Sequence, residues 1–472
     1  MTMRSLKAIL LVGFFVLGFL TPASAFGCFA QDVKTLPVPD ERYKVDILLV
    51  VAHPDDEAAA TSYLARALDE GKRVGVVYGT RGSSGANDTG TEQAAALGAI
   101  REIEARRALA TLGIRNVWFV GGRDTASQDV LASLASWGHG PMLAELVRIV
   151  RLTRPEVILT FLPGTFIGED HGDHQAAGVL ATEAFDLAGD PVAFPEQVTG
   201  PMRRLEPFFD NLRPWQTKKI YYFPDATRED IFKAKGPTIE VTGISKSTNL
   251  PYWRMAVDSF RSHETQAKAY IDSFSKLSEE EITKKGASDG WSQPQEYVLG
   301  KSLVGGSVTG DIFEGITPGA IAFARVAVPA EPARTDLSVE LAGTWDFYAK
   351  FRRAHGLEQL PHPEPPEIAL QAGGTLVIPL WLRNETESAQ EIKLAVDLPA
   401  GWKVESGAGN FRVAAKQVAA ARIEVNLPAL PPADANAKKV DAQEVTVRGE
   451  AGGKPIGTVK LRVELRKKAL PQ

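Results

Sequence analysis

Two short segments of the chain are rich in side chains that ligate metals. The first is His53-Pro54-Asp55-Asp56-Glu57, and the second is Asp170-His171-Gly172-Asp173-His174. Together they contain three of the chain's seven histidines. Two imidazole nitrogens and one carboxylate, with positions left open for water, form the usual catalytic Zn²⁺ site, and the same ligands suit Fe²⁺. If folding brings the two segments together, they predict one catalytic metal centre.

The elements around these segments predict that they do meet. Strand-like apolar runs and helix-like segments alternate along the first part of the chain. The expected strands are 45–51, 74–78, 117–120 and 157–162, and the expected helices are 56–69, 92–112, 142–152 and 173–185. One more helix is expected later in the chain, over 253–275. This alternation predicts an α/β fold, a Rossmann-like and mainly parallel sheet with helices on both faces. In the strand order 3-2-1-4, strands one and four are neighbours, and the loops at their carboxyl ends face one crevice.

The two adjacent acids of the first segment, Asp55 and Asp56, are expected to have different roles. His53 and Asp56 converge on one cation if the loop folds back, and Pro54 stiffens that loop by fixing its own φ. Asp55 then points elsewhere and is free to act as a base. The alternative is structural: the acids open a helix, where carboxylates favour the positive N-terminal end, and the histidines are satisfied in their loops. Two such segments at expected neighbouring strand ends favour the metal centre.

Over roughly residues 40–275, these motifs resemble the LmbE-like, or PIG-L-like, deacetylase family. Two further stretches are similar to later family motifs, namely Arg101-x-x-Glu104 with Leu112-Gly113, and His263-Glu264-Thr265-Gln266. The family has a Rossmann-like fold. It removes N-acetyl groups from N-acetylglucosamine attached to inositol, thiol cofactors or other carriers. The resemblance therefore implies a zinc-dependent N-deacetylase that acts on an N-acetylated sugar or glycan.

The resemblance also implies a role for each residue of the two segments. His53, Asp56 and His174 would ligate Zn²⁺, with Fe²⁺ as the alternative. Asp55 would be the general base that takes a proton from water. His171 would stabilise the tetrahedral oxyanion or protonate the leaving amine. Asp173 would orient a histidine or cap the helix that follows it.

Three other residues are candidate substrate contacts: Arg81, Asp124 and His263. Arg81 lies in the loop after the second expected strand, and Asp124 follows the third. Family members often carry Glu directly after the matched Thr-x-Gly, where this chain has Ser83. Because of this difference, the identity of the substrate stays open, whereas the expected chemistry is unaffected. The remaining histidines, which form no pattern with partners and are expected to be structural or exposed, are His139, His355 and His362.

Other classes of function fit the sequence less well. A dinucleotide-binding oxidoreductase needs a Gly-rich turn after the first strand, and a serine hydrolase needs a G-x-S-x-G elbow; the sequence has neither in place. The formal net charge of −5 gives no general attraction to nucleic acid or to an anionic membrane. Two alternatives stay open: a non-catalytic carbohydrate-binding protein that keeps the fold, and a metal-dependent amidase for a non-sugar N-acyl compound.

The N-terminus predicts export. A basic start, an apolar run and Ala23-Ser24-Ala25 form a signal peptide over residues 1–25. The mature protein is then expected to be periplasmic or secreted, with no integral membrane segment. Lipid anchoring through Cys28, the only cysteine, is the less favoured alternative.

The rest of the chain divides into three expected parts. Residues 36–325 form the catalytic domain, 326–366 a connector with a helix expected around 345–355, and 367–470 a β-domain. Within the last part, short strand-like runs separated by turns such as Pro399-Ala400-Gly401 predict an Ig-like β-sandwich. We expect this module to bind a polymer or a surface and to carry no catalytic residues.

Overall fold

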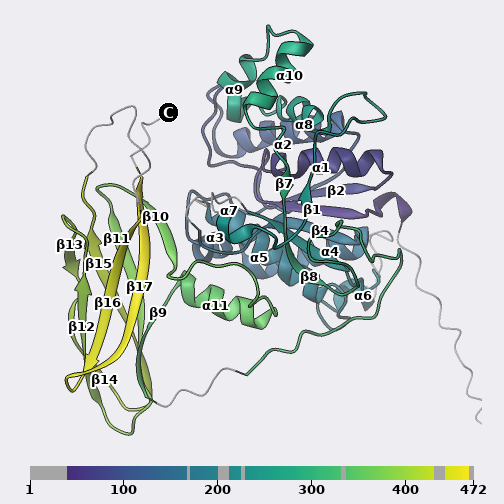
Figure 1. The fold of residues 1–472 in the computed structure, drawn as a ribbon. Helices are drawn as coiled ribbons and strands as arrows, with labels where there is room; N and C mark the ends of the chain where they lie inside the picture. The colour runs from purple at the N-terminus through teal and green to yellow at the C-terminus, as the bar shows by residue number, and fades with distance from the viewer. Residues whose placement is uncertain are drawn as a thin grey trace, which may run out of the picture. The chain divides into compact units, whose positions relative to one another are not determined.

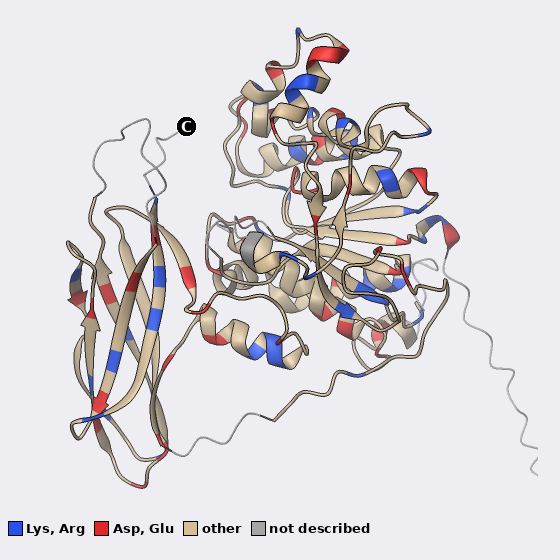
Figure 2. Ribbon diagram, viewed as in Figure 1, with Lys and Arg blue, Asp and Glu red and all other residues tan. Residues whose placement is uncertain are grey.

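The computed structural model describes most of the chain after the N-terminal segment. The described residues are 40–166, 171–199, 212–224, 229–330, 336–429 and 442–466. The signal-peptide prediction and Cys28 lie outside them. No helix of the described part is long and apolar enough to cross a membrane. In Figure 2, acidic and basic residues are interspersed along the ribbon, in keeping with the small formal net charge.

The first domain is built on a six-stranded sheet (Figure 1) with the order β3-β2-β1-β4-β5-β8. Its strands are β1 (Ile47–Val51), β2 (Val74–Tyr78), β3 (Asn116–Phe119), β4 (Val157–Phe161), β5 (Lys219–Phe223) and β8 (Val298–Ser302). β8 is antiparallel to β5, while the other neighbours pair in parallel. Every residue of β1 and β4 is buried, as expected for central parallel strands covered on both faces. The expected order 3-2-1-4 is confirmed.

Helices cover both faces of this sheet (Figure 1). On one side lie α1 (Ala58–Asp69), α2 (Ala94–Thr111) and α8 (Tyr252–Phe260), and on the other lie α3 (Val130–Trp137), α4 (His139–Thr153) and α5 (Gly172–Leu187). The remaining elements of this domain are η1 (Glu41–Tyr43), α6 (Glu196–Thr199), α7 (Glu229–Phe232), α9 (Glu264–Asp272), α10 (Glu279–Ser288), β6 (Thr238–Ile239) and β7 (Gln295–Glu296). The expected helices along 56–69, 92–112, 142–152 and 173–185 all form, with ends that differ by at most three residues.

One local expectation was wrong, and one helix was not predicted. A single helix was expected over 253–275, but the chain leaves the helical conformation between α8 and α9, where His263 has φ −89° and ψ 56°. The short helix α3 was not foreseen. It begins at Val130, and the N-cap residue before it is Asp129, whose side chain accepts from the backbone N–H of Leu131, as is typical of residues that start helices.

The C-terminal part consists of two sheets around one apolar core. One has the order β10-β17-β16-β12-β14 and the other β13-β15-β11-β9. These strands are β9 (Leu337–Leu341), β10 (Glu367–Gln371), β11 (Thr375–Asn384), β12 (Gln390–Asp397), β13 (Lys403–Ser406), β14 (Gly409–Val413), β15 (Gln417–Asn426), β16 (Gln443–Ala451) and β17 (Lys454–Arg466). Buried side chains of both sheets, such as Ile378 and Val447, belong to the same core.

The expected connector 326–366 is not a plain linker. Its β9 pairs with β11 and so belongs to a C-terminal sheet. Its helix α11 (Thr344–Ala354) instead contributes Tyr348 and Phe351 to the core of the first domain. Tyr348 also hydrogen-bonds Gln175 of α5 at 2.5 Å. The segment thus supplies structure to both domains.

Candidate metal centre and active site

The two metal-type segments meet at the carboxyl ends of β1 and β4. These strands pair in parallel from Ile47 with Val157 to Val50 with Thr160, so the chain leaves both at the same edge of the sheet. His53 follows β1 by two residues, and His174 lies in the first turn of α5. The parallel pairing therefore brings side chains about 120 positions apart in sequence into one site.

Asp56 is the centre of this site. Its Oδ2 accepts from the backbone N–H groups of Ala52 and His53 at 3.0 and 2.7 Å, so the loop after β1 folds back on itself. The same Oδ2 lies 3.4 Å from Nδ1 of His53, and Oδ1 lies 3.2 Å from Nε2 of His174. Burial by itself raises the pKa of Asp56, but the two histidines lower it well below its usual range. The carboxylate is therefore charged.

These residues fit a divalent metal ion. One ligand atom each from His53, Asp56 and His174 lies within 4.8 Å of the others. Nε2 of His53 faces Asp124 Oδ1 at 3.0 Å and Asp173 Oδ2 at 3.3 Å, which leaves Nδ1 for the site. Metal-ligating histidines commonly donate their other ring N–H to a carboxylate in this way. The sequence-predicted ligand set is thus brought together.

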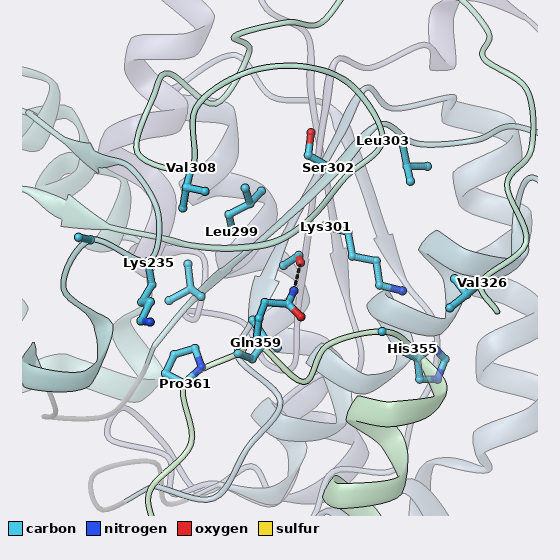
Figure 3. Close-up of a pocket in the computed structure, with 15 residues that line it drawn as sticks. Lys235, Leu299, Lys301, Ser302, Leu303, Val308, Val326, His355, Gln359 and Pro361 are labelled. Atoms are coloured by element: carbon cyan, nitrogen blue, oxygen red, sulfur yellow. Dashed lines mark hydrogen bonds between the residues drawn. The ribbon is translucent and has the colours of Figure 1, made fainter. Parts of the chain in front are cut away.

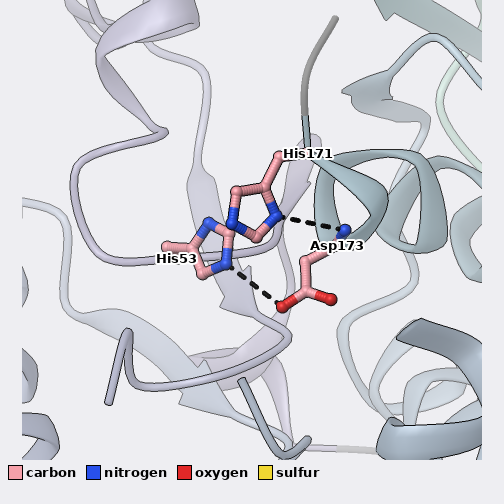
Figure 4. Close-up of side chains that lie close together, drawn as sticks. All are labelled: His53, His171 and Asp173. Carbon is pink, nitrogen blue, oxygen red and sulfur yellow. Dashed lines mark hydrogen bonds and ion pairs between the residues drawn. The ribbon is translucent and has the colours of Figure 1, made fainter. Parts of the chain in front are cut away.

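Asp173 belongs to the support of the site (Figure 4). His53, His171 and Asp173 also come close enough to hold an ion. However, Asp173 is fully buried, and its two carboxylate oxygens accept from the backbone N–H and the hydroxyl of Thr125 at 2.9 and 2.8 Å. Two roles were expected for Asp173, orienting a histidine and capping the helix. The structure places Asp173 in contact with His53, as the first role requires, whereas His171 caps the helix.

His171 is placed to donate a hydrogen bond. Its Nδ1 accepts from the backbone N–H of Asp173 at 3.3 Å (Figure 4), which leaves the proton of the neutral ring on Nε2. Burial, together with the neighbouring His53 and His174, lowers the pKa of His171 to about 4. The ring is therefore neutral at ordinary pH.

Asp55 lines the crevice beside Asp56. Burial, and next the charge of Asp56, raise the pKa of Asp55 to about 7. Its backbone has φ 100°, a region that residues other than glycine rarely adopt. The crevice has a volume of about 390 Å³, and its walls are His53, Asp55, Asp56, Gly82, Ser84, Gly85, Arg101, Asp124, Thr125, Ala126, His171, His174 and Gln266.

The three expected substrate contacts have different positions. Asp124 does line the crevice, but its oxygens are taken by His53 and by the backbone N–H of Ser84 at 2.6 Å. Arg81 points away and pairs with Glu102 at 2.6 Å. His263 is completely buried, with Nε2 2.6 Å from Glu57 Oε1. Arg81 and His263 are therefore not among the walls of the crevice, so the structure does not bring these two expected contacts to it.

Arg101 is a site residue whose role the sequence did not reveal. It is buried, and its guanidinium donates to the carbonyls of Gly82 and Ala86 at 2.5 and 2.7 Å and to the hydroxyl of Thr265 at 3.3 Å. Arg101 thus fixes the loop after β2 as a wall of the crevice. In the sequence, the signal was the presence of two family-like motifs, one with Arg101 and Glu104 and one with Thr265. The structure shows that these motifs contact each other, because Glu104 accepts from the backbone N–H and the hydroxyl of Thr265 at 2.9 and 2.6 Å.

The remaining histidines lie elsewhere, in ion pairs. His139 pairs with Glu183 at 2.5 Å, and His362 with Glu364 at 3.1 Å. His355 lines a separate cavity of about 670 Å³ beside β8, together with Lys301 (Figure 3). Both contact Asp186, at 2.6 and 2.7 Å. One carboxylate thus joins the two side chains in a structural cluster.

The fold and the site define a class of α/β protein with a His–Asp–His centre at the switch point of a parallel sheet. Comparisons with known proteins narrow the class. The family model PIG-L, described as GlcNAc-PI de-N-acetylase, matches residues 48–185, which include both metal-type segments. The chain belongs to this family, and it is an N-deacetylase, a hydrolase that cleaves an amide bond.

Several relatives are curated as 1D-myo-inositol 2-acetamido-2-deoxy-alpha-D-glucopyranoside deacetylases. The chain is 32% identical over 230 residues to the protein of Streptomyces avermitilis, covering 44% of this chain and 71% of that one. It is 28% identical over 225 residues to that of Thermobispora bispora, covering 44% and 68%. Among solved structures, it is similar to N,N'-diacetylchitobiose deacetylase from Pyrococcus horikoshii, with 18% identity, TM-score 0.38 and coverage of 56% and 86%.

Proposed function

We propose that the protein removes the N-acetyl group of an N-acetylglucosamine-type sugar or glycoconjugate, with Zn²⁺ held by His53, Asp56 and His174. The observation that carries the proposal is the position of Asp56 between the two histidines, with Asp55 in the wall of the same crevice. The names of the relatives, which are deacetylases of an acetylated glucosamine linked to inositol, support the class of substrate.

The donor set suits the proposed metal. Two imidazoles and one carboxylate are typical of catalytic Zn²⁺ sites, and Fe²⁺ remains the second candidate because it accepts the same ligands. When bound, such an ion acidifies water and polarises the carbonyl of an amide.

Asp55 is the proposed general base. A base works best when its pKa is near the working pH, and burial with the charge of Asp56 raises the pKa of Asp55 to about 7. Asp55 takes a proton from the attacking water. A positioned base of this kind contributes ~10²–10⁴-fold to the rate.

His171 is the proposed oxyanion donor. Because Nδ1 of His171 accepts from Asp173 N–H, the proton of its neutral ring lies on Nε2, which is the atom that would donate to the developing negative charge. Removing one such donor typically costs ~3–4 kcal/mol of transition-state stabilisation. Asp124 and Asp173 accept from the far nitrogen of His53 and so hold that ring in place.

The test combines metal content with amine release. Wild type, His174→Ala and Asp55→Asn are measured by mass spectrometry for bound metal, and by free-amine release from N-acetylglucosamine and its β-linked dimer. We expect about one Zn²⁺ per chain in the wild type and in Asp55→Asn, and a loss in His174→Ala. Amine release should fall in both variants. A fully active Asp55→Asn would show that the base is another group.

Two further proposals concern the ends of the chain. We propose that residues 1–25 direct export and that the C-terminal sheets form an Ig-like module that binds a polymer or a surface. The two sheets with one shared core support the second point. N-terminal sequencing of the protein from periplasm and medium tests the first. Sedimentation of the full chain with insoluble chitin or peptidoglycan tests the second, and recovery in the supernatant alone would contradict it.

A further inference from the structure

One peptide group beside the proposed base is held at both of its polar atoms. It is the peptide that joins Pro54 to Asp55. Its carbonyl, on Pro54, accepts from Nε2 of Gln266 at 2.6 Å. Its N–H, on Asp55, donates to Oε2 of Glu57 at 2.9 Å. Two hydrogen bonds to opposite ends of one planar group fix the rotation of that plane.

The groups that hold this peptide are themselves anchored. The other carboxylate oxygen of Glu57, Oε1, lies 2.6 Å from Nε2 of His263, and both side chains are buried, with 2% and 0% exposed. His263 and Gln266 belong to the same short segment. Between them, Thr265 is bound through its N–H and hydroxyl to Glu104 of α2. The segment is therefore fixed to the domain independently of Asp55.

The conformation of Asp55 explains why such a hold is needed. A φ of 100° costs energy for a residue with a side chain, and such conformations persist where the surroundings over-determine them. Rotation about φ changes the direction of the Cα–Cβ bond relative to the preceding peptide. The orientation of the Pro54–Asp55 peptide thus decides where the Asp55 carboxylate points.

We propose that Glu57, His263 and Gln266 form a peptide clamp that aims the Asp55 carboxylate into the crevice. They are positioning residues, which act on the reaction through Asp55. This inference rests on the proposed function, in which Asp55 is the base. It assigns a purpose to the break between α8 and α9, because that break places His263 and Gln266 against the loop after β1.

The experiment uses Gln266→Met, which keeps most of the side-chain volume and removes the donor. Its matched control is Gln295→Met. Gln295 is also half-buried and bonds the start of α1, donating to the carbonyl of Ala59 at 2.8 Å and accepting from the N–H of Tyr63 at 2.9 Å. It lies outside the walls of the crevice. The full chain is used throughout, with N-acetylglucosamine as substrate.

We expect Gln266→Met to lower kcat by about 10- to 100-fold with KM and bound metal unchanged, since a displacement of about 1 Å can cost 10²-fold. Hydrogen–deuterium exchange should show faster uptake at the Asp55 amide in this variant, and unchanged uptake in Gln295→Met. In the Asp55→Asn background the substitution should cause no further loss, because residues that act as one unit are non-additive. His263→Gln, which keeps a donor, should retain more activity than His263→Leu.

Contrary outcomes are separable. The same fold-loss in the Asp55→Asn background, or a change in KM alone, would show that Gln266 contacts substrate, and would overturn the clamp. Unchanged deuterium uptake would overturn it without reference to catalysis. If Asp55→Asn is as active as wild type, the proposed base is wrong and the clamp has no target. If Asp55→Asn is inactive and Gln266→Met retains full activity, only the clamp fails.

Discussion

Substituting Gly178 by alanine should loosen the metal centre through the packing of α5. A Cβ at this position would lie 2.3 Å from the carbonyl oxygen of Phe161, which belongs to β4 at the edge where the site is built. That distance is about 1 Å short of van der Waals contact. The obstacle is backbone of a buried strand, so α5 must move away from the sheet.

The size of the effect follows from two opposing terms. Alanine gains up to ~1 kcal/mol over glycine in a helix, while overpacking a filled core costs ~1–3 kcal/mol and occasionally more. With a contact this short, we expect Gly178→Ala to lose about 2 kcal/mol of the free energy of unfolding. His174 lies four residues earlier, one turn along α5, and faces Asp56 at 3.2 Å. Displacement of α5 should therefore weaken metal binding, by roughly tenfold if it resembles the loss of a supporting contact.

The experiment compares Gly178→Ala in α5 with a control substitution of a glycine in the neighbouring helix α4. Gly140 lies in α4, and a Cβ there would meet nothing within 4 Å, so Gly140→Ala should be neutral or stabilising by about 0.5 kcal/mol. Urea unfolding monitored by fluorescence gives the free energies, and competition with a chromophoric chelator gives the Zn²⁺ affinity. Equal stability and equal affinity in the two variants would refute the packing argument.

Three other outcomes are expected. Asp124→Asn should reduce Zn²⁺ affinity by about 10- to 100-fold, since it weakens the acceptor of His53 Nε2; chelator competition measures this, and unchanged affinity would remove Asp124 from the support of the site. Removing metal with a chelator should lower Tm and adding Zn²⁺ should restore it, because a ligand at 100 times its Kd adds ~2.7 kcal/mol; a Tm that ignores Zn²⁺ would contradict the site. The hydrogen bond to Glu183 raises the pKa of His139, so its stabilisation is full below the unfolded pKa of about 6.5 and is lost as pH rises through the folded pKa. The Tm advantage of wild type over His139→Gln should therefore shrink from pH 5.5 to pH 9, while staying small for a half-exposed pair; an advantage that grows with pH would reverse the assignment.

The sequence was sufficient to predict strands β1 to β4 of the sheet and the convergence of the two metal-type segments, but not the strands β5 and β8 that complete the sheet. The reason is physical: parallel strands place their carboxyl ends at one edge, so strand order alone brings His53 and His174 together. It was not sufficient for contacts that depend on side-chain direction. Arg81 lies in the expected loop but points toward Glu102. His263 lies in an expected family motif but is buried against Glu57, at the break between α8 and α9 where one continuous helix was expected.

At the boundary between the two domains, too, the sequence did not reveal which segments contact each other. Scattered prolines indicated a connector over 326–366 with one helix, which is α11, but not that β9 pairs with β11 or that α11 packs into the first core. Pairing of β9 begins at Leu341 with Leu380, residues about 40 positions apart in sequence. A strand of five residues carries too little local signal to reveal such a partner.

The distribution of charge in the crevice argues that a cation belongs to it. Asp55, Asp56 and Asp124 all line the walls, whereas Arg101 is the one lysine or arginine among them, and its donors are directed at backbone carbonyls. Burying several carboxylates is costly unless positive charge compensates them. Asp55 shows this cost, because burial and the charge of Asp56 raise its pKa to about 7. A divalent ion between His53, Asp56 and His174 would add positive charge where the ligand atoms converge. The buried carboxylates that destabilise the site without a metal ion would therefore give the site affinity for a metal ion.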